Sequence, residues 1–177
     1  MRLFIAINFD ENVKNKILRI QRGLMMGTTG GNFSHKENLH LTLAFLGEVA
    51  EKELTKLHGI IDGLKSQPFD ITIGALDMFR GGDICYLDLS APKELFDLQK
   101  GLTSALKASG FQTDKKKYTP HLTIAREVKF STSFSLIKFN DSISPIHSCV
   151  SRVSLMKSER IKGKLTYTEI YGKDLTI

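Results

Sequence analysis

The sequence predicts an α+β fold: a bilobal, duplicated domain in which two antiparallel β-sheets line a central cleft and helices pack outside. Stretches with strand and helix periodicity alternate along a chain of 177 residues, as expected for an α+β domain. Residues 40–44 recur in nearly the same form as residues 121–125, 81 positions later, which indicates an internal repeat. We expect one domain over residues 1–177, made of pseudo-symmetric halves at about 1–80 and 81–177.

In the first half, residues 3–8 predict a strand, and Asp10 is a plausible N-cap for the helix that follows. The apolar stripe of this helix consists of Val13, Ile17, Ile20 and Leu24. Gly30 and Gly31 indicate a mobile loop near the cleft. Residues 51–65 predict a further helix, and residues 69–79 alternate as a strand.

The second half repeats this order. Residues 84–89 predict a strand, after which Ser90 can cap a helix that Gly110 closes as a C′ glycine. The stripe of this helix consists of Leu95, Leu98, Leu102, Ala105 and Leu106. Residues 148–156 predict a strand, whereas residues 130–143, which correspond to the helix at 51–65, are less regular. The duplication is therefore imperfect.

Equal spacings relate the two halves. Ile5 precedes His40 by 35 residues, and Tyr86 precedes His121 by the same number. No stretch rich in Gly, Ser or Pro separates the halves, so we expect them to share one core. A pseudo-twofold axis between them would bring equivalent faces of the two sheets together.

The repeated segments carry a His-x-Thr pair. Because residues i and i+2 of a strand point to the same side, His40 shares a face with Thr42, and His121 shares a face with Thr123. An imidazole with a pKa of about 6.5 can be neutral or protonated near neutral pH, so one ring can accept a proton from water while the other donates one. The threonine hydroxyls can bind phosphate oxygens. Arg126 either adds positive charge beside a phosphate bound by these groups, or it is a solvated cation at the end of the strand.

The composition is that of a soluble globular protein, with 41% hydrophobic and 25% charged residues. A net charge of +6 favours anionic partners, although it also serves solubility. Cys85 and Cys149 lie in apolar stretches, so we expect buried, reduced thiols. No CxxC or HExxH motif suggests a metal site, and the apolar N-terminal run is too short for a signal peptide or a membrane span. We expect a cytoplasmic monomer that is not bound to a membrane.

The motifs resemble those of the two-histidine (2H) phosphoesterase superfamily and, within it, of the RNA 2′,3′-cyclic phosphodiesterase family, also called 2′-5′ RNA ligase. The resemblance rests on residues 2–7, 40–47 and 118–126, and on a tail at residues 155–158 that is followed by Gly163 and Tyr167. It covers nearly the whole chain. The paired His-x-Thr motifs are specific for the superfamily but less specific for the substrate.

The resemblance implies hydrolysis of a 2′,3′-cyclic phosphate, on RNA ends or nucleotides, to a 2′-phosphomonoester without a metal or cofactor, and allows reversible 2′-5′ ligation. It implies that His40 is the general acid for the departing O3′ and that His121 is the general base for water, although a symmetric site could run either way. It places Thr42, Thr123 and Arg126 at the phosphate.

The sequence allows two interpretations of each further candidate for a substrate contact. Phe45 either stacks on a base in the cleft or packs in the core. The basic run of Lys115, Lys116 and Lys117, with Tyr118 after it, either contacts the RNA backbone or forms a solvated turn. Two other functions are also open, namely a 2H phosphodiesterase for a small cyclic nucleotide or sugar cyclic phosphate, and a non-catalytic RNA-binding module. Two intact His-x-Thr pairs argue against the second, because a pure binder has no need of two imidazoles.

Overall fold

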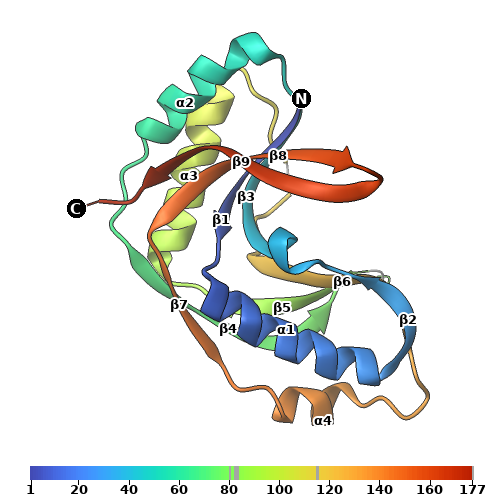
Figure 1. Ribbon diagram of the computed structural model, residues 1–177. Helices are drawn as coiled ribbons and strands as arrows, with labels where there is room; N and C mark the ends of the chain where they lie inside the picture. Colours follow the sequence, from blue (N-terminus) through green and yellow to red (C-terminus); the bar gives the residue numbers. More distant parts are fainter. Residues whose placement is uncertain (80, 82–83, 115, 177) are drawn as a thin grey trace.

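The computed structural model describes residues 1–79, 81, 84–114 and 116–176. Along this part of the chain, strands and helices alternate as the sequence predicts (Figure 1). The elements are β1 (Arg2–Asn8), α1 (Glu11–Met26), β2 (Thr28–Phe33), η1 (Lys36–Asn38), β3 (His40–Glu48), η2 (Glu51–Glu53), α2 (Leu54–Asp62), β4 (Phe69–Met78), β5 (Ile84–Ser90), α3 (Lys93–Ala108), β6 (His121–Phe130), α4 (Leu136–Asp141), β7 (Ile146–Val150), β8 (Arg152–Ile161) and β9 (Lys164–Asp174).

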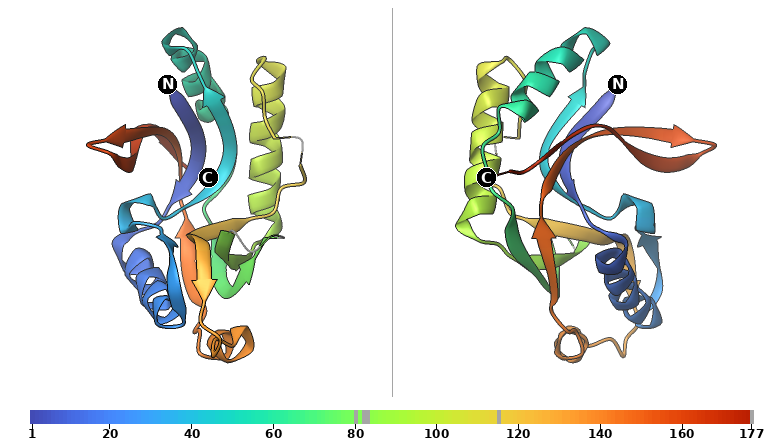
Figure 2. Two further views of the ribbon diagram at one scale, coloured as in Figure 1. Left: turned by 90° about the vertical axis from the view of Figure 1, so that its right-hand side faces the viewer. Right: turned by 60° about the vertical axis from the view of Figure 1, so that its left-hand side comes forward.

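The strands form two antiparallel sheets, which confirms the predicted α+β class. One sheet has the order β3-β1-β8-β9 and the other the order β2-β6-β5-β4-β7. Each sheet contains strands from both halves of the chain: β8 completes the sheet of β1 and β3, and β4 completes the sheet of β5 and β6. The two lobes therefore do not coincide with the two halves of the sequence, and the chain crosses between them more than once (Figures 1 and 2).

The helix ends follow the sequence signals with one exception. The Asp10 carboxylate accepts a hydrogen bond from the Val13 N–H at 2.7 Å and caps α1, and Gly110, with φ of 86°, follows the end of α3. The prediction that Ser90 caps α3 is wrong. Ser90 still pairs with β4, and the helix begins only after Pro92, whose ring has no N–H to leave unpaired at a helix start.

Three segments differ from the predictions. The strand predicted at residues 148–156 is two strands, β7 and β8, because the chain leaves one sheet at Ser151 and enters the other. Gly30 and Gly31 lie in β2 and not in a loop, since pairing with β6 outweighs their low strand propensity. Both cysteines are free, as predicted, but Cys149 is exposed and not buried because β7 is an edge strand.

The register also corrects the spacing of the repeat by one residue. Ala6 lies opposite Thr42, and Tyr86 lies opposite Thr123, so the counterpart of Tyr86 is Ala6 and not Ile5. A shift of one residue exchanges the two faces of a strand. Ile5 accordingly points into the core, where it is fully buried.

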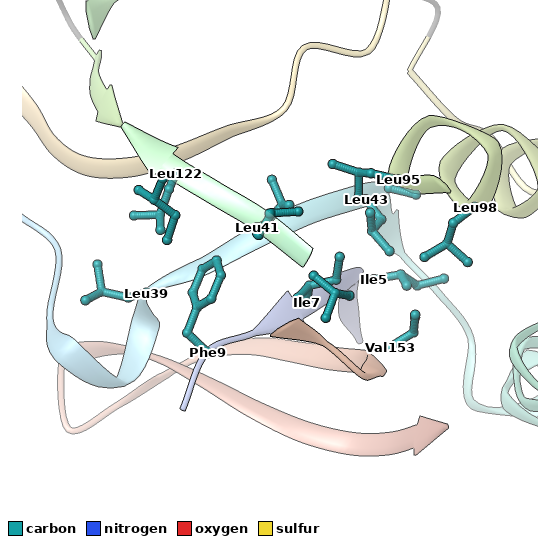
Figure 3. Packing of buried hydrophobic residues seen from close by; sticks show 14 of the residues in the cluster. Ile5, Ile7, Phe9, Leu39, Leu41, Leu43, Leu95, Leu98, Leu122 and Val153 are labelled. Atoms are coloured by element: carbon teal, nitrogen blue, oxygen red, sulfur yellow. The ribbon is translucent and has the colours of Figure 1, made fainter. Parts of the chain in front are cut away.

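A continuous cluster of buried apolar side chains connects the two sheets and the helices (Figure 3). Leu41 and Leu43 of β3 and Leu122 of β6 enter it from the strands, and Leu95 and Leu98 enter it from α3. Burial of each such side chain contributes about 1.5–3 kcal/mol to folding. One common core therefore packs against the apolar faces of both strands that carry a His-x-Thr pair. No helix of the described residues combines the length and the hydropathy that crossing a membrane requires.

Candidate active site

β3 contains a bulge that directs a third side chain to the same face of the strand as His40 and Thr42. Along β1, the residue pairing skips Leu43 between Thr42 and Ala44. Leu43 and Ala44 are therefore both buried, and Phe45 emerges with 51% of its surface exposed. A β-bulge re-aims the side chains that follow it, so His40, Thr42 and Phe45 line one face.

The same bulge occurs in β6. The pairing with β5 skips Ile124 between Thr123 and Ala125, both of these apolar residues are buried, and Arg126 emerges exposed. Arg126 is therefore the structural counterpart of the third residue of β3. His121, Thr123 and Arg126 line one face of the second sheet.

The His40 ring is held by hydrogen bonds at both nitrogens. Its Nδ1 lies 2.7 Å from the Asn38 carbonyl oxygen, which can only accept, so Nδ1 donates. In the neutral ring Nε2 then has no hydrogen, and it accepts from the Thr42 hydroxyl at 3.0 Å. The rings of Phe4 and Tyr167 lie 4.9 and 5.2 Å from the imidazole, centre to centre. The orientation of the ring and its tautomer are thereby fixed.

The His121 ring is held in a similar way. Its Nδ1 donates to the Thr119 carbonyl oxygen at 2.8 Å, which leaves Nε2 for the cleft. The rings of Phe79 and Tyr86 lie edge-on at 4.8 and 5.5 Å from the imidazole. The Tyr86 hydroxyl donates to the Asp77 carboxylate at 3.0 Å and is itself fixed. Each histidine is therefore oriented by a backbone carbonyl two residues before it and enclosed by two aromatic rings.

The electrostatic environment of His40 favours its neutral form. Burial lowers the pKa of His40, its hydrogen bond to the Asn38 carbonyl raises it, and the positive charges of His121, Lys14 and Arg126 lower it further. Positive charge on the groups around His40 therefore acts in the same direction as burial. Lys14, which no motif marks, was not predicted to influence this ring.

Two hydroxyl groups connect β3 and β6 in a reciprocal manner. The Tyr118 hydroxyl, just before β6, donates to the Thr42 carbonyl oxygen of β3 at 3.1 Å. The Ser34 hydroxyl, shortly before β3, donates to the Thr123 carbonyl oxygen of β6 at the same distance. Burial raises the pKa of the Tyr118 phenol, so it remains a donor at neutral pH. We call these two contacts the hydroxyl braces.

Tyr118, which follows the basic run, lies beside a helix. Lys116 and Lys117 are exposed, and Lys115 lies outside the described residues. The ring of Tyr118, which follows them, packs on Phe96 of α3, with 6.3 Å between the ring centres. The core alternative for Phe45 is wrong because its ring is half exposed.

Several residues of the site were not predicted from the sequence. Phe4, Phe79 and Tyr86 enclose the histidines, but an aromatic residue on an apolar strand looks the same whether it faces the core or a cleft. Tyr167 had a signal only as part of the tail motif. Over residues 1–79, 81, 84–114 and 116–176, no three His, Cys, Asp or Glu side chains are grouped as a metal site.

Comparison with known proteins identifies the family. The model of the 2′-5′ RNA ligase superfamily matches residues 11–162. The chain belongs to this superfamily. It is 30% identical to the RNA 2′,3′-cyclic phosphodiesterase of Methanothermobacter thermautotrophicus, with 96% of each chain covered. It is also 30% identical to the Escherichia coli protein of the same name, with 99% of this chain and 97% of that protein covered.

A solved structure has the same fold. The crystal structure of Escherichia coli LigT complexed with 3′-AMP superposes with a TM-score of 0.84 at 25% identity, and the alignment covers 99% of this chain and 98% of LigT. The two proteins therefore share one α+β fold over almost their whole length.

Proposed function

We propose that this protein is an RNA 2′,3′-cyclic phosphodiesterase that opens a terminal 2′,3′-cyclic phosphate with water to a 2′-phosphomonoester. Reversible 2′-5′ ligation would follow the same path with a 5′-hydroxyl in place of water, so that the P–O3′ bond breaks and a 2′-5′ phosphodiester forms. One observation carries the proposal. Two strands with the same bulge present His40 with Thr42, and His121 with Thr123, on equivalent faces of two sheets. The similarity to proteins named RNA 2′,3′-cyclic phosphodiesterase supports the choice of substrate.

The chemistry requires one proton acceptor and one proton donor. His121 accepts a proton from water as the water oxygen attacks phosphorus, and the P–O3′ bond breaks as His40 gives its proton to O3′. An in-line displacement needs these groups on opposite sides of the phosphate, which a pseudo-twofold pair supplies. The surroundings of His40 favour its neutral form. Binding of an anionic phosphate shifts the ring toward its protonated form, because an adjacent negative charge raises the pKa of an imidazole.

The remaining polar groups bind the phosphate. Protonation of His40 at Nε2 ends the donation from the Thr42 hydroxyl to that nitrogen, so the hydroxyls of Thr42 and Thr123 can donate to the non-bridging oxygens. Arg126 stabilises the negative charge that develops in the transition state. Phe45 offers an exposed ring to the nucleobase, while Lys116 and Lys117 are candidate contacts to the RNA backbone. The Tyr118 hydroxyl donates to a carbonyl oxygen, so we assign Tyr118 a structural role in the site and not a contact to RNA.

Product analysis tests this function. An RNA that ends in a 2′,3′-cyclic phosphate is incubated with the protein in excess EDTA, and the ends are then separated as 2′- and 3′-phosphates. We expect complete conversion to the 2′-phosphate. A 3′-phosphate product, or activity that is lost in EDTA and restored by zinc or manganese, contradicts the proposal. Turnover of a small cyclic nucleotide but not of RNA would favour the alternative substrate class.

A sulfur-substituted substrate tests the division between acid and base. Sulfur in place of O3′ leaves readily as a thiolate and needs no proton from a general acid. We expect this substrate to rescue most of the activity of His40→Ala, whereas His121→Ala remains slow because its water still needs a base. Rescue of His121→Ala alone would show that the two roles are exchanged.

A further inference from the structure

The β8–β9 hairpin forms an arm that extends beyond the rest of its sheet. β1 pairs with β8 only as far as Ser158, whereas β8 and β9 pair with each other up to Ile161 and Lys164. Lys162 and Gly163 form the turn with φ values of 51° and 81°, the sign that a two-residue type I′ turn requires. The arm stands out from the body of the molecule (Figures 1 and 2).

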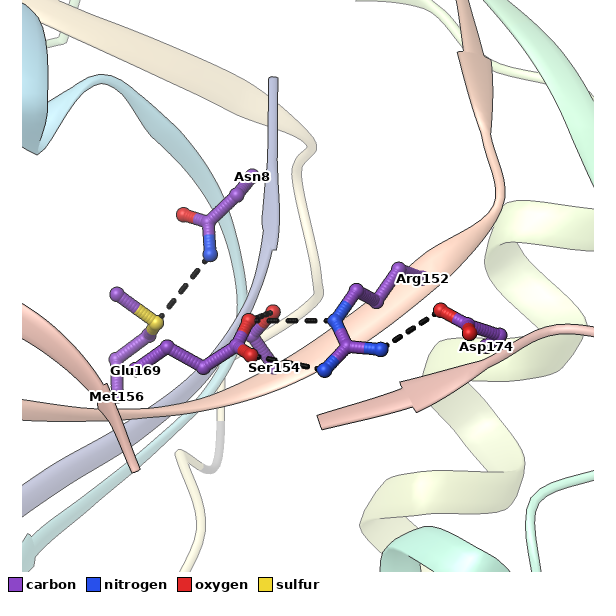
Figure 4. A network of polar contacts seen from close by, with 6 residues as sticks. All are labelled: Asn8, Arg152, Ser154, Met156, Glu169 and Asp174. Atoms are coloured by element: carbon purple, nitrogen blue, oxygen red, sulfur yellow. Dashed lines mark hydrogen bonds and ion pairs between the residues drawn. The ribbon is translucent and has the colours of Figure 1, made fainter. Parts of the chain in front are cut away.

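The arm is fixed at its base and along its edge. Arg152 of β8 donates to the carboxylates of Glu169 and Asp174 on β9 at 2.9 and 2.7 Å (Figure 4). Further out, the Asn38 side chain donates to the Leu165 carbonyl oxygen at 3.0 Å. Because the Asn38 carbonyl also orients the first histidine ring, the arm has a defined position relative to the candidate active site.

One face of the arm continues the cleft surface that contains His40. Tyr167 is on this face, since its ring contacts the His40 ring. Ser158 lies directly opposite Tyr167, and Arg160 lies directly opposite Leu165. Directly opposed residues share a face, as do residues i and i+2. The side chains of Ser158, Arg160 and Leu165 therefore lie on the His40 side of the arm.

The neighbouring strands extend this face. Arg2 of β1 lies opposite Ser158 and two positions from Phe4, whose ring also contacts the His40 ring. Phe45 lies opposite Phe4, with 6.0 Å between the ring centres. We define the arm surface as the residues on this face beyond the histidine: Arg2, Phe45, Ser158, Arg160 and Leu165.

The arm surface combines positive charge with exposed apolar groups. Within the described ranges, Arg2 and Arg160 take part in no ion pair, whereas the carboxylates around them do. Glu48, opposite Arg2, lies 3.4 Å from the N-terminal amine, and Glu159 lies 2.8 Å from the Lys157 ammonium. Basic groups beside an exposed aromatic ring are the pattern that binds single-stranded nucleic acid.

We propose that the arm surface binds the nucleotides immediately preceding the cyclic phosphate in the RNA chain, an inference that rests on the proposed function. The cyclic phosphate closes the 3′ end, so the remaining RNA leaves the site in one direction. Arg2 and Arg160 contact the first internal phosphates, and Phe45 stacks on a base. The arm therefore makes the protein prefer oligonucleotides to mononucleotides.

The double variant Arg2→Ala/Arg160→Ala tests this proposal against Lys100→Ala/Lys107→Ala, which removes the same charge from exposed positions on α3. The substrates are a pentanucleotide and a mononucleoside, each with a 2′,3′-cyclic phosphate. We expect KM for the pentanucleotide to rise several-fold, and the slope of log KM against log salt to fall by up to about 1.4, or about 0.7 for each lost phosphate contact. The control variant and the mononucleoside should show neither change.

Equal effects of the double variant on both substrates would overturn the proposal, as would no effect on either. If the wild-type protein hydrolyses neither substrate, the proposed function has failed. The arm is then tested by fluorescence anisotropy with a labelled pentanucleotide that ends in a 2′-phosphate. Weaker binding by the double variant alone supports the RNA surface, and equal binding by all three proteins rejects it. Equally strong competition by polyglutamate would reject RNA as the partner.

Discussion

The strands β3 and β6 share a pattern of side chains but differ in its third residue. Each presents a histidine and a threonine to the cleft, then a bulge, and then a third side chain on the same side. That third residue is Phe45 in β3 and Arg126 in β6. The duplication thus determines where the side chains lie, and the one difference places an aromatic ring on one side of the site and a positive charge on the other.

The two histidines also differ in their surroundings. The hydrogen bond from His40 to Asn38 is partly buried, whereas the equivalent bond from His121 to Thr119 is exposed. Burial is the main cause of the lowered pKa of His40. The two rings therefore occupy matching positions but differ in their exposure to solvent.

The largest effect is expected from the histidines themselves. His40→Ala and His121→Ala should each lower kcat by about 10²–10⁴, the usual contribution of a positioned acid or base. The double variant should be much less than multiplicatively slower, because the pair acts as a unit. His58→Ala, which removes a ring stacked on Tyr171, is the control and should retain full activity. Near-normal turnover by either single variant would contradict the assignment.

The third residues of the two strands, Phe45 and Arg126, should affect different kinetic constants. Arg126→Ala should lower kcat by roughly 10²–10³, as does loss of a group that stabilises charge in the transition state. Phe45→Ala should mainly raise KM, since loss of base stacking costs about 1–3 kcal/mol of binding. Steady-state kinetics on the pentanucleotide measure both. The same pattern of kcat and KM in the two variants would show that the positions do not have separate tasks.

The lowered pKa of His40 predicts the pH dependence. We expect a bell-shaped profile of kcat/KM, because one imidazole must be protonated and the other neutral. The acidic limb reports the lower macroscopic pKa of the pair, whichever ring is the acid. A lowered pKa means that the proton leaves at lower pH, so this limb should lie below the ordinary histidine value of about 6.5. In the kcat profile it should move to higher pH, because the bound phosphate stabilises the protonated ring. An acidic limb of kcat/KM above the ordinary value would contradict this interpretation.

The smallest effects are expected at the hydroxyl braces. Tyr118→Phe and Ser34→Ala each remove one hydrogen bond, so each should lower the free energy of unfolding by about 1 kcal/mol and reduce kcat a few-fold. Tyr171→Phe is a matched control, because it removes a phenol bond to Asp62 of α2 and should affect stability alone. Thermal unfolding and kcat are measured on all three. An unchanged kcat in both brace variants would reduce the braces to a stabilising role.

Much of the site could be predicted because it depends on local periodicity. The i, i+2 rule alone places each histidine beside its threonine, and an apolar stripe with a capping aspartate is sufficient to predict α1. The repeat itself showed that the two strands are equivalent.

The remaining features depend on pairing between distant strands. Strict alternation beyond Thr42 would place Ala44 in the cleft and Phe45 in the core, and only the register with β1 shows the bulge that reverses them. The exchange of β4 and β8 between the sheets is likewise a tertiary choice that no local signal encodes. The one-residue error in aligning Ile5 with Tyr86 arose from the same cause.

Histidine NMR tests most directly the central claim that both imidazoles act on one phosphate. The protein is labelled with ¹⁵N-histidine and titrated with adenosine 2′-monophosphate, the product that the proposed reaction would leave in the site. We predict that the Nε2 resonances of His40 and His121 shift together with a single Kd, while those of His58 and His147 remain unchanged. A response from only one of the two cleft histidines, or two different Kd values, would contradict a shared phosphate site.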